Sequence, residues 1–505
     1  MFIKQLYTGC LSEAAYYIDS DGEAAVIDPL RDIEAYLKLA EERKAKIKYI
    51  FETHFHADFV SGHLDLAKAT GAPIIYGPRT ETNFPIHLAK DGERFRLGDS
   101  TIEVLHTPGH TVESSCYLVR VPQTADAAPA SDNFGGAPGD AKAPNAAPDD
   151  ADAAPGDADA DGKPYALFTG DTLFVGDVGR PDLSSGNLSR EELAGMLYDS
   201  LRSKIMPLPD DLMIYPAHGP GSSCGKNLGP NTHSTLKEEK ETNYALKELS
   251  REEFIKAVTD GLLTPPEYFS VNARINKEGY ESLDAVLETG LQPLDIAAFR
   301  KWIDDDAILL DTRRSDLFVA GFVPGSISIG LDGRFAEWAG SILSFSKPMV
   351  LVTAPGEEKE SVVRLARVGF DKVKGYLQGG FEAWQQAGEP IDMIIDVEAD
   401  ELAMDIPFDE NLVVVDVRRE TEFADGHVSG AINLPLQELT DPGNMAQFEE
   451  SDNLYVHCGG GYRSIIAASL LKRQGIHNLR NVTGGWGKIK DQKGIEIVKE
   501  KSVLN

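Results

Sequence analysis

The chain of 505 residues is long enough for about three domains, because single hydrophobic cores stop growing beyond roughly 250–300 residues. Its composition, 42% hydrophobic and 26% charged, is that of a globular protein and excludes a fibrous or wholly disordered one. The formal net charge of -32 repels phosphate groups, which argues against nucleic acids and anionic membranes as partners.

The cysteine content and the N-terminus suggest where the protein works. Four cysteines are too few for a disulfide framework, so a reducing compartment is favoured. The opening MFIKQLYTGC lacks the apolar run of a signal peptide, and no apolar stretch reaches the ~18 residues of a membrane span. We therefore expect a soluble, cytoplasmic protein, and we expect it to form a homo-oligomer.

Residues 1 to about 260 alternate short β-rich runs with helical stretches. From Gln123 to Gly162 the chain is almost entirely Ala, Asp, Pro and Gly, a composition that cannot build a core, so we expect a disordered insertion at 123–162. The strands predicted around it are AAYYID, AAVIDP, KYIFETH, TIEVLHTP, SSCYLVRV, YALFTGD and LMIYPAHG.

The C-terminal part of the chain contains a repeat. ILLDTRRSDLF, with Asp311, is echoed 105 residues later by VVVDVRRETEF, with Asp416, and the same offset separates GlyGlyPhe at 379–381 from GlyGlyTrp at 484–486. Each copy alternates strands and helices, which predicts a parallel α/β domain. The predicted boundaries are 1–260 for the first domain, 261–290 for a linker, and 291–391 and 392–505 for the two related domains.

Four predicted strand ends of the first domain carry residues of the types that bind metals. A rigid strand end aims such side chains, and with only 11 histidines in the chain their recurrence at this one place indicates a metal site. The residues are His54, His56 and Asp58 after KYIFET, His110 after TIEVLHTP, Asp171 after YALFTG, and His218 after LMIYPA.

These motifs resemble the metallo-β-lactamase fold, whose signature is T-H-x-H-x-D-H followed by a distant His, Asp and His. One position departs from that signature, since Phe59 stands where binuclear zinc hydrolases carry a histidine for a second metal. A second metal would lose a nitrogen donor and gain an apolar ring beside it, so we expect it to bind poorly. The matching motifs are Thr53–Asp58, Thr107–Thr111, Thr169–Thr172 and Pro216–Gly219.

A single metal with three protein ligands has three open coordination positions. Two histidines and one carboxylate on one face are typical of non-haem Fe(II) oxygenases, so we expect one Fe(II) per chain and O2 as co-substrate. The expected ligands are His54, His110 and Asp171. The residues expected to orient these ligands or pass protons are His56, Asp58 and His218.

Among metallo-β-lactamase relatives, the pattern resembles the persulfide dioxygenases, in particular through Gly170–Phe174 and Gly179–Asp182. The resemblance implies oxygenation of the outer sulfur of a low-molecular-weight persulfide, of glutathione or coenzyme A type, to sulfite and thiol. It also makes Arg180 a candidate for binding the substrate carboxylate or the product oxyanion.

Cys224 follows the His218 strand in a glycine-rich loop, GPGSSCGK. We expect this loop to expose the thiol and Lys226 to lower its pKa, which would make Cys224 a persulfide-carrying thiol near the metal.

A second constellation lies in the last domain, where LYVH runs into CGGGYRS and an apolar helix. A strand, a glycine-rich loop and a helix N-terminus surround the Cys458 sulfur with backbone N–H groups, which favours the thiolate and a persulfide on it. Arg463 closes the loop and is expected to bind the anionic end of the substrate. The loop residues expected to contact substrate are Gly459, Gly460, Gly461 and Tyr462.

These residues resemble rhodanese, the sulfurtransferase domain, over about 395–500, through Asp416–Arg418, His427–Ala431, the Cys458 loop and Gly484–Trp486. In the first repeat Ala354 stands opposite Cys458, so we expect that copy to be catalytically inactive and structural. The implied fold class is α/β, a metallo-β-lactamase αβ/βα sandwich followed by two rhodanese-like parallel α/β domains.

The combined prediction is an iron persulfide dioxygenase coupled to rhodanese sulfur transfer between persulfide, sulfite and thiosulfate, in a direction that the sequence leaves open. One alternative is a zinc-dependent thioester hydrolase of the hydroxyacylglutathione type with a fused rhodanese. A second alternative is a sulfur-relay or sensing protein without turnover, whose N-terminal fold merely binds metal.

Overall fold

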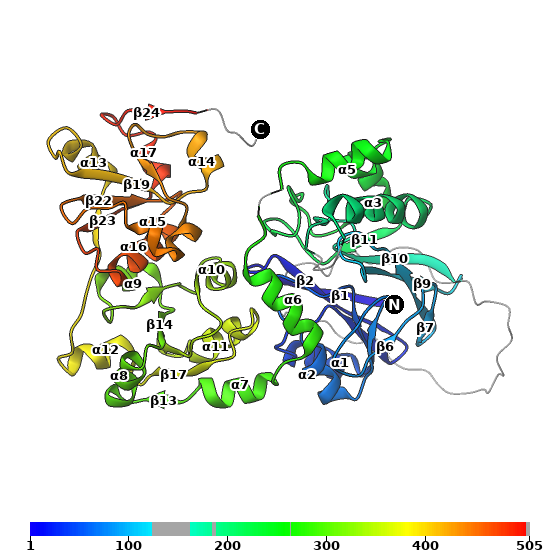
Figure 1. Cartoon of the computed structure of the whole chain (residues 1–505). Coiled ribbons are helices and arrows are strands. Elements are labelled where there is room, and N and C mark those ends of the chain that lie inside the picture. The colour runs from blue at the N-terminus through cyan, green and yellow to red at the C-terminus, as the bar shows by residue number, and fades with distance from the viewer. Residues whose placement is uncertain (124–161, 184–187, 263, 501–505) are drawn as a thin grey trace, which may run out of the picture. The chain divides into compact units, whose positions relative to one another are not determined.

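The computed structural model describes residues 1–123, 162–183, 188–262 and 264–500, and the predicted insertion at 123–162 lies almost wholly outside them (Figure 1). Internal contacts divide the chain into two compact units, Met1–Pro265 with Phe269–Tyr280, and Pro266–Tyr268 with Glu281–Asn505. In the described part of the chain, no helix has the length and apolar character needed to cross a bilayer.

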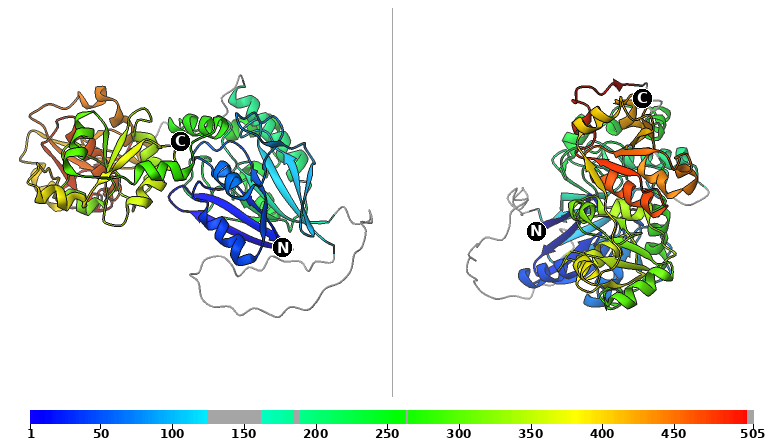
Figure 2. Two further views of the ribbon diagram at one scale, coloured as in Figure 1. Left: turned by 90° about the horizontal axis from the view of Figure 1, so that it is seen from below. Right: turned by 90° about the vertical axis from the view of Figure 1, so that its left-hand side faces the viewer.

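The first unit is built on two six-stranded sheets that pack face to face, the blue and the cyan-to-green strands of Figure 2. The core between them joins Tyr16 and Phe51 of one sheet to Tyr117, Phe168 and Tyr215 of the other. The first sheet contains β1 (Phe2–Thr8), β2 (Glu13–Ser20), β3 (Glu23–Ile27), β4 (Lys46–Glu52), β5 (Ile74–Tyr76) and β6 (His87–Leu88). The second contains β7 (Arg94–Leu97), β8 (Ser100–His106), β9 (Ser115–Val121), β10 (Lys163–Gly170), β11 (Met213–Pro216) and β12 (Ser234–Thr235).

Helices cover the outer face of each sheet in this unit. Tyr36 of α1 and Leu66 of α2 pack on the first sheet, and Leu197 of α3 and Phe254 of α5 pack on the second. Because both faces are covered, β2 is buried along its whole length. The predicted αβ/βα sandwich is therefore confirmed. The helices are α1 (Glu34–Arg43), α2 (His63–Thr70), α3 (Arg190–Ser200), α4 (Leu236–Thr242), α5 (Arg251–Thr259) and α6 (Tyr268–Glu278).

The second unit contains two five-stranded parallel sheets, one for each copy of the repeat. The first has the order β13-β17-β16-β14-β15 and the second β18-β23-β22-β19-β21, so corresponding strands occupy corresponding places. The strands are β13 (Pro293–Leu294), β14 (Ile308–Asp311), β15 (Ile327–Ser328), β16 (Met349–Val352), β17 (Val373–Leu377), β18 (Ile395–Val397), β19 (Leu412–Asp416), β21 (Ile432–Asn433), β22 (Asn453–His457) and β23 (Leu479–Val482).

Helices alternate with these strands as the sequence predicts. An antiparallel pair, β20 (His427–Val428) with β24 (Ile497–Val498), lies beside the second sheet. The helices of the first copy are α7 (Leu283–Gly290), α8 (Ile296–Asp304), α9 (Ser315–Ala320), α10 (Phe335–Ile342), α11 (Glu358–Ala366) and α12 (Gly380–Gln386). Those of the second are α13 (Ala399–Asp405), α14 (Glu420–Ala424), α15 (Pro442–Met445), α16 (Tyr462–Arg473) and α17 (Trp486–Ile489).

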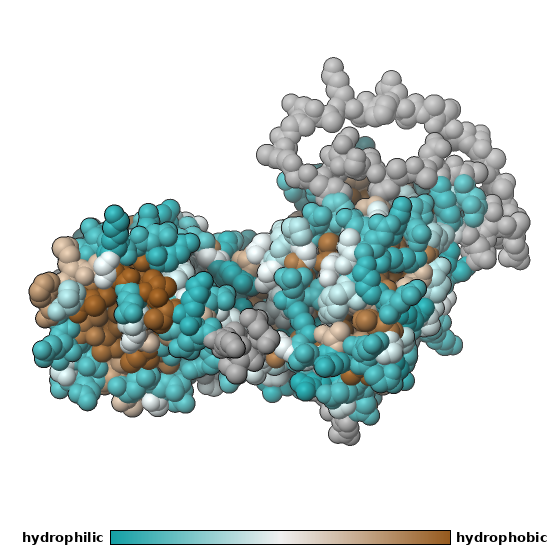
Figure 3. Space-filling view, turned by 90° about the horizontal axis from the view of Figure 1, so that it is seen from above, coloured by the Kyte–Doolittle hydropathy of each residue, from teal (hydrophilic) through white to brown (hydrophobic). Residues whose placement is uncertain are grey.

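Apolar side chains also gather on the surface of the second unit, where Figure 3 shows a brown area. Contiguous apolar surface of this kind is characteristic of association sites, but nothing here identifies an occupant, so the expected homo-oligomer stays a prediction. The exposed large apolar residues of this unit include Met393, Ile395, Met404 and Phe408.

Candidate functional site

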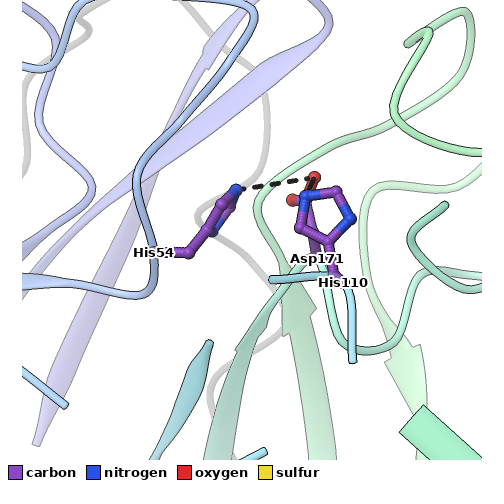
Figure 4. A group of neighbouring side chains, drawn as sticks. All are labelled: His54, His110 and Asp171. Carbon is purple, nitrogen blue, oxygen red and sulfur yellow. Dashed lines mark ion pairs between the residues drawn. The ribbon is translucent and has the colours of Figure 1, made fainter. Parts of the chain in front are cut away.

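The three predicted metal ligands meet at the end of the sandwich. His54 follows β4 of the first sheet, whereas His110 follows β8 and Asp171 follows β10 of the second. Figure 4 shows the imidazole of His54 facing Asp171, with Nε2 at 3.8 Å from Oδ2. Nε2 of His110 is 3.4 Å from the same oxygen, and all three side chains are buried. One ligand atom from each lies within 4.8 Å of the others, close enough for one ion.

The local structure fixes the orientation of both imidazoles. Nδ1 of His110 lies 2.8 Å from the main-chain oxygen of Arg180, and Nδ1 of His54 lies 2.9 Å from the Thr53 hydroxyl. Thr53 in turn donates to the Asp28 carboxylate through both its N–H and its hydroxyl. Outer partners of this kind hold Nε2 toward a bound metal. Burial and the neighbouring imidazoles lower the pKa of His54 well below its ordinary value, so its lone pair is available.

The Asp171 carboxylate gives a direct test of whether a metal fits. Both of its oxygens are buried and have no hydrogen-bond partner among the described residues. Leaving a carboxylate uncompensated in the interior costs several kcal/mol, and a divalent cation between Asp171, His54 and His110 removes that cost. Two imidazoles and one carboxylate are also a donor set that transition metals accept. The residues present therefore fit a metal ion.

A second buried cluster consists of His56, Asp58 and His218. Nε2 of His218 is 3.5 Å from both Asp58 and Asp171, so this cluster adjoins the first. The ring of Phe59 is buried, and its centroid lies 4.3 Å from that of the His56 ring. An apolar group thus stands where the resemblance expects a nitrogen ligand for a second metal. The predicted absence of a second metal is untested and stays a prediction.

Acidic residues that the sequence analysis did not single out surround His56. Its Nε2 lies 3.0 Å from Asp28 and 3.6 Å from Glu52. Burial by itself would lower the pKa of His56, but Asp28, Glu52 and Asp58 together raise it to about 10. His56 is thus engaged by carboxylates from β4 and from the end of β3.

The segment predicted as a linker contributes to the metal loop. The side chain of Asn276, in α6, donates to the main-chain oxygens of His56 and Phe59 at 2.8 Å each and accepts from the N–H of Ser61 at 2.9 Å. One buried amide thus holds the backbone that follows His54. No sequence signal marks Asn276, because its partners lie more than 200 residues away in the chain.

The prediction that the Cys224 thiol is exposed and has a lowered pKa is wrong. The thiol is 1% exposed, and burial together with Asp58 and Asp171 raises its pKa well above the ordinary value. Lys226 does not counteract this, because its ammonium donates to the carbonyls of Ala257 and Asp260 at the end of α5. The predicted proximity is correct, since one ligand atom each of Cys224, Asp171 and His218 lie within 4.8 Å.

Arg180 connects the metal loop to the Cys224 loop. Its guanidinium forms a two-point ion pair with Asp182, at 2.7 and 2.8 Å, and its main-chain N–H donates to the carbonyl of Cys224. The side chain is 4% exposed, so Arg180 acts here on the structure of the site, and its predicted contact with substrate is untested.

In the second unit, the Cys458 loop joins β22 to α16. The sulfur accepts a hydrogen bond from the N–H of Gly461 at 3.1 Å and lies 3.7 Å from the Ser464 hydroxyl. The main-chain oxygen of Cys458 accepts from the N–H of Trp486 at 2.7 Å. Gly485 approaches so closely that a Cβ there would lie 2.3 Å from that oxygen, which explains the second glycine of the Gly-Gly-Trp motif.

Arg463 has a partner that the sequence analysis missed. Its guanidinium pairs with both carboxylate oxygens of Glu422, at 2.6 and 2.8 Å. A pocket of about 550 Å³ opens beside these residues and Cys458. Its lining includes the predicted Gly460, Tyr462 and Arg463, together with Gly333, Arg334, Trp338, Arg419 and Glu422.

The first copy of the repeat has no nucleophile at the matching place. The expected alignment of Ala354 with Cys458 is wrong by one residue, because Thr353 directly follows the last residue of β16 as Cys458 follows the last residue of β22, and the two strands have the same register with β14 and β19. The loop after Thr353 reads Ala-Pro-Gly-Glu instead of three glycines. The loop therefore has neither a thiol nor an equivalent glycine-rich cradle.

Comparison with known proteins agrees with this architecture. The model of the metallo-beta-lactamase superfamily matches residues 8–122, and that of the rhodanese-like domain matches 295–387 and 398–492. The crystal structure of a metallo-beta-lactamase from Staphylococcus aureus subsp. aureus COL is 31% identical, with 75% of this chain and 98% of that chain covered and a TM-score of 0.59. The crystal structure of ETHE1 from Myxococcus xanthus is 26% identical over 55% of this chain and 98% of its own, with a TM-score of 0.41.

Among curated proteins, the chain is similar to the probable hydroxyacylglutathione hydrolase glo2 of Schizosaccharomyces pombe (strain 972 / ATCC 24843). The two are 26% identical over 219 residues, which are 42% of this chain and 66% of the relative, just under two thirds of its length. The chain belongs to the metallo-beta-lactamase superfamily, and its metallo-beta-lactamase domain is followed by two rhodanese-like domains.

Proposed function

We propose that the N-terminal domain is an iron-dependent persulfide dioxygenase and that the last domain transfers sulfane sulfur through Cys458. The observation that carries the first part is the buried trio His54, His110 and Asp171, with Phe59 in place of a further donor. A ferrous ion held by this trio supplies redox chemistry and open coordination positions for substrates. The overall reaction converts persulfide, O2 and water into thiol, sulfite and two protons, with four electrons passing from the outer sulfur to O2.

The protein's own residues have defined parts in this proposal. Thr53 and the main-chain oxygen of Arg180 orient the two imidazoles, and Asn276 holds the backbone of the ligand loop. The surroundings are buried, so bulk water is excluded and the polar groups of the site act strongly on a bound anion. The substrate class is a low-molecular-weight persulfide of glutathione or coenzyme A type.

The sulfur-transfer part rests on the cradle around Cys458. The N–H of Gly461 and the N-terminus of α16 stabilise negative charge on the sulfur. In one direction, the thiolate takes the outer sulfur of thiosulfate and releases sulfite, and a thiolate acceptor then removes that sulfur as a persulfide. In the reverse direction, sulfite accepts the outer sulfur of the persulfide on Cys458 and leaves as thiosulfate, and Cys458 returns to the thiolate. In both directions, a product of one site is a substrate of the other: persulfide in the first direction and sulfite in the reverse.

A zinc-dependent thioester hydrolase is the second candidate, and the similarity to a probable hydroxyacylglutathione hydrolase favours it. Such an enzyme uses a metal-activated water and needs no redox-active ion. Phe59 beside His56 supports the dioxygenase instead, because it replaces a donor expected for a second metal.

The test is the His110→Ala variant of the full chain, loaded with Fe(II) and given glutathione persulfide in an oxygen electrode. We expect stoichiometric iron in the wild type and a fall in O2 uptake larger than the roughly 100-fold typical of losing an outer metal partner. His87→Ala is the matched control, because that imidazole is 46% exposed and pairs with Glu93 on the surface.

Near-stoichiometric zinc, thioester hydrolysis and no persulfide-dependent O2 uptake would establish the hydrolase instead. Binding of persulfide without turnover would indicate the relay or sensing protein. Calorimetry of the same His110→Ala sample shows whether the first unit is folded, and sulfur transfer by Cys458 shows that the second unit is intact.

A further inference from the structure

The pocket beside Cys458 is built by both rhodanese-like domains. The first, which lacks a nucleophile, contributes Gly333, Arg334 and Trp338 to its lining, and the second contributes the rest. Its volume of about 550 Å³ falls within the roughly 300–1,000 Å³ of cavities that bind drug-sized molecules. Thiosulfate is a small tetrahedral ion and fills only a fraction of such a space. The pocket therefore has room for a larger substrate.

The wall from the first domain is firmly attached to the catalytic loop. The hydroxyl of Tyr462 donates to the main-chain oxygen of Gly330 at 2.7 Å. Gly333 lies against the Tyr462 ring so closely that a Cβ at 333 would be 2.3 Å from it. Further along the contact, Ser328 donates its N–H to the Ser469 hydroxyl at 3.0 Å. This wall is thus a fixed part of the pocket.

Two arginines, one from each domain, are linked by a single carboxylate at the pocket. Nε of Arg334 lies 2.6 Å from one oxygen of Glu337, and Nη2 of Arg419 lies 3.3 Å from the other. The two arginine side chains remain 47% and 43% exposed. Because both side chains reach the solvent at the pocket, a carboxylate or phosphate on a bound molecule can approach them.

The charge of the pocket is opposite to that of the protein. Among the residues that line the pocket, the cations Arg334, Arg419 and Arg463 outnumber Glu422 and the Cys458 thiolate, which leaves one net positive charge in the lining. The whole chain carries -32. A positive concavity in an acidic surface concentrates anions, and guanidinium groups bind carboxylates and phosphates with directed hydrogen bonds. Trp338 adds an aromatic wall for the uncharged part of a ligand.

We propose that this pocket binds an anionic thiol carrier, with the carrier's sulfur at Cys458 and its remote anionic group at Arg334 and Arg419. The first rhodanese-like domain then selects the carrier, although it performs no chemistry. This inference rests on the proposed sulfur transfer at Cys458. The shared ligand chemistry is a carboxylate or phosphate on the carrier, as in glutathione or coenzyme A respectively.

The test measures binding of S-methylglutathione and S-methyl-coenzyme A to the full chain by isothermal titration calorimetry. These thioethers cannot accept sulfur, so binding is separated from turnover. In Arg334→Gln we expect the affinity for one probe to fall about tenfold or more, as for loss of a charge-assisted hydrogen bond. Arg300→Gln is the control, since it removes a charge from the same domain at an exposed pair with Glu389.

The preferred probe identifies the anionic group, carboxylate for the glutathione derivative and phosphate for the coenzyme A derivative. Identical titrations for wild type and Arg334→Gln with both probes would overturn the inference. Sulfur transfer from thiosulfate to cyanide, a small acceptor that forms thiocyanate, is measured in parallel. Its absence in the wild type would refute the proposed transfer at Cys458, whereas its presence in the wild type together with weakened probe binding in Arg334→Gln supports both proposals.

Discussion

The two rhodanese-like domains share an internal clamp but differ at the loop where chemistry takes place. In each, a buried arginine two residues after an aspartate donates to both of its oxygens, with the shortest contact 2.6 Å in both copies. Each arginine also lies over an aromatic ring, at 4.5 Å in one copy and 4.4 Å in the other. The corresponding residues are Asp311, Arg313 and Phe381, and Asp416, Arg418 and Trp486.

This comparison separates what holds the fold from what performs the reaction. The clamp joins the end of β14 or β19 to the first turn of the last helix of the same copy, α12 or α17, and it is present with or without a thiol. Thr353 stands where the other copy has Cys458, and its loop has one glycine in place of three. The chemistry therefore depends on a few loop residues added to a frame that stands without them.

The largest expected effect comes from Cys458→Ser. We expect thiosulfate-to-thiol sulfur transfer to fall at least about 10³-fold, because loss of a nucleophile leaves only binding and electrostatic effects. Persulfide-dependent O2 uptake should stay near the wild-type rate. Cys10→Ser, which changes a partly exposed cysteine of the first unit, is the matched control. Loss of both activities in Cys458→Ser would show that the two sites are not independent.

Loss of the arginine from either clamp should lower the stability of the second unit by a similar amount. Arg313→Met and Arg418→Met each leave a buried aspartate without its partner, and such a change costs about 3–5 kcal/mol. Burial already raises the pKa of Asp311. We expect calorimetry of the full chain to show a lower melting temperature of the second unit in both variants. A large effect at only one position would mean that the two frames are not alike.

Contact between the copies should matter less than the clamps. Ser469→Ala removes the acceptor of the Ser328 N–H, a buried bond that joins the two rhodanese-like domains. An unsatisfied buried N–H costs about 1–3 kcal/mol, so we expect a smaller decrease in the same calorimetric transition. Ser346→Ala, which changes an exposed serine of the first copy, should leave the transition in place.

The smallest expected effect is at the inactive loop itself. Thr353→Cys in a Cys458→Ser background should restore no measurable sulfur transfer, because Ala354, Pro355 and Glu357 surround the only glycine of this loop where the active copy has three glycines. Thiosulfate-to-cyanide transfer is the readout. Recovery of activity would show that the thiol alone, rather than its surroundings, distinguishes the two copies.

Much of this fold follows from local sequence. Alternating apolar runs predicted the strands, and the 105-residue offset predicted two related domains, since both signals lie within short segments. The meeting of His54, His110 and Asp171 followed from their common position at strand ends. These features are local in the chain and repeat in a recognisable way.

The environment of the site was harder to predict, because distant residues determine it. Cys224 stands in a glycine-rich loop, yet Arg180 binds the carbonyl of that loop and the thiol is buried. Asn276 reaches the metal loop from a segment that looked like a linker. Arg334 and Trp338 line the Cys458 pocket from a domain that has no thiol. None of these contacts leaves a periodic or motif-like trace in the sequence.

The metal trio draws on both halves of the sandwich, with His54 from one sheet and His110 and Asp171 from the other. An ion bound there thus links the two sheets and stabilises their packing, in addition to serving as the reaction centre. By mass action, a free ion concentration 100 times its dissociation constant adds about 2.7 kcal/mol to the stability of the sandwich. Removal of the ion by a chelator should therefore lower the melting temperature of the first unit and leave that of the two rhodanese-like domains unchanged.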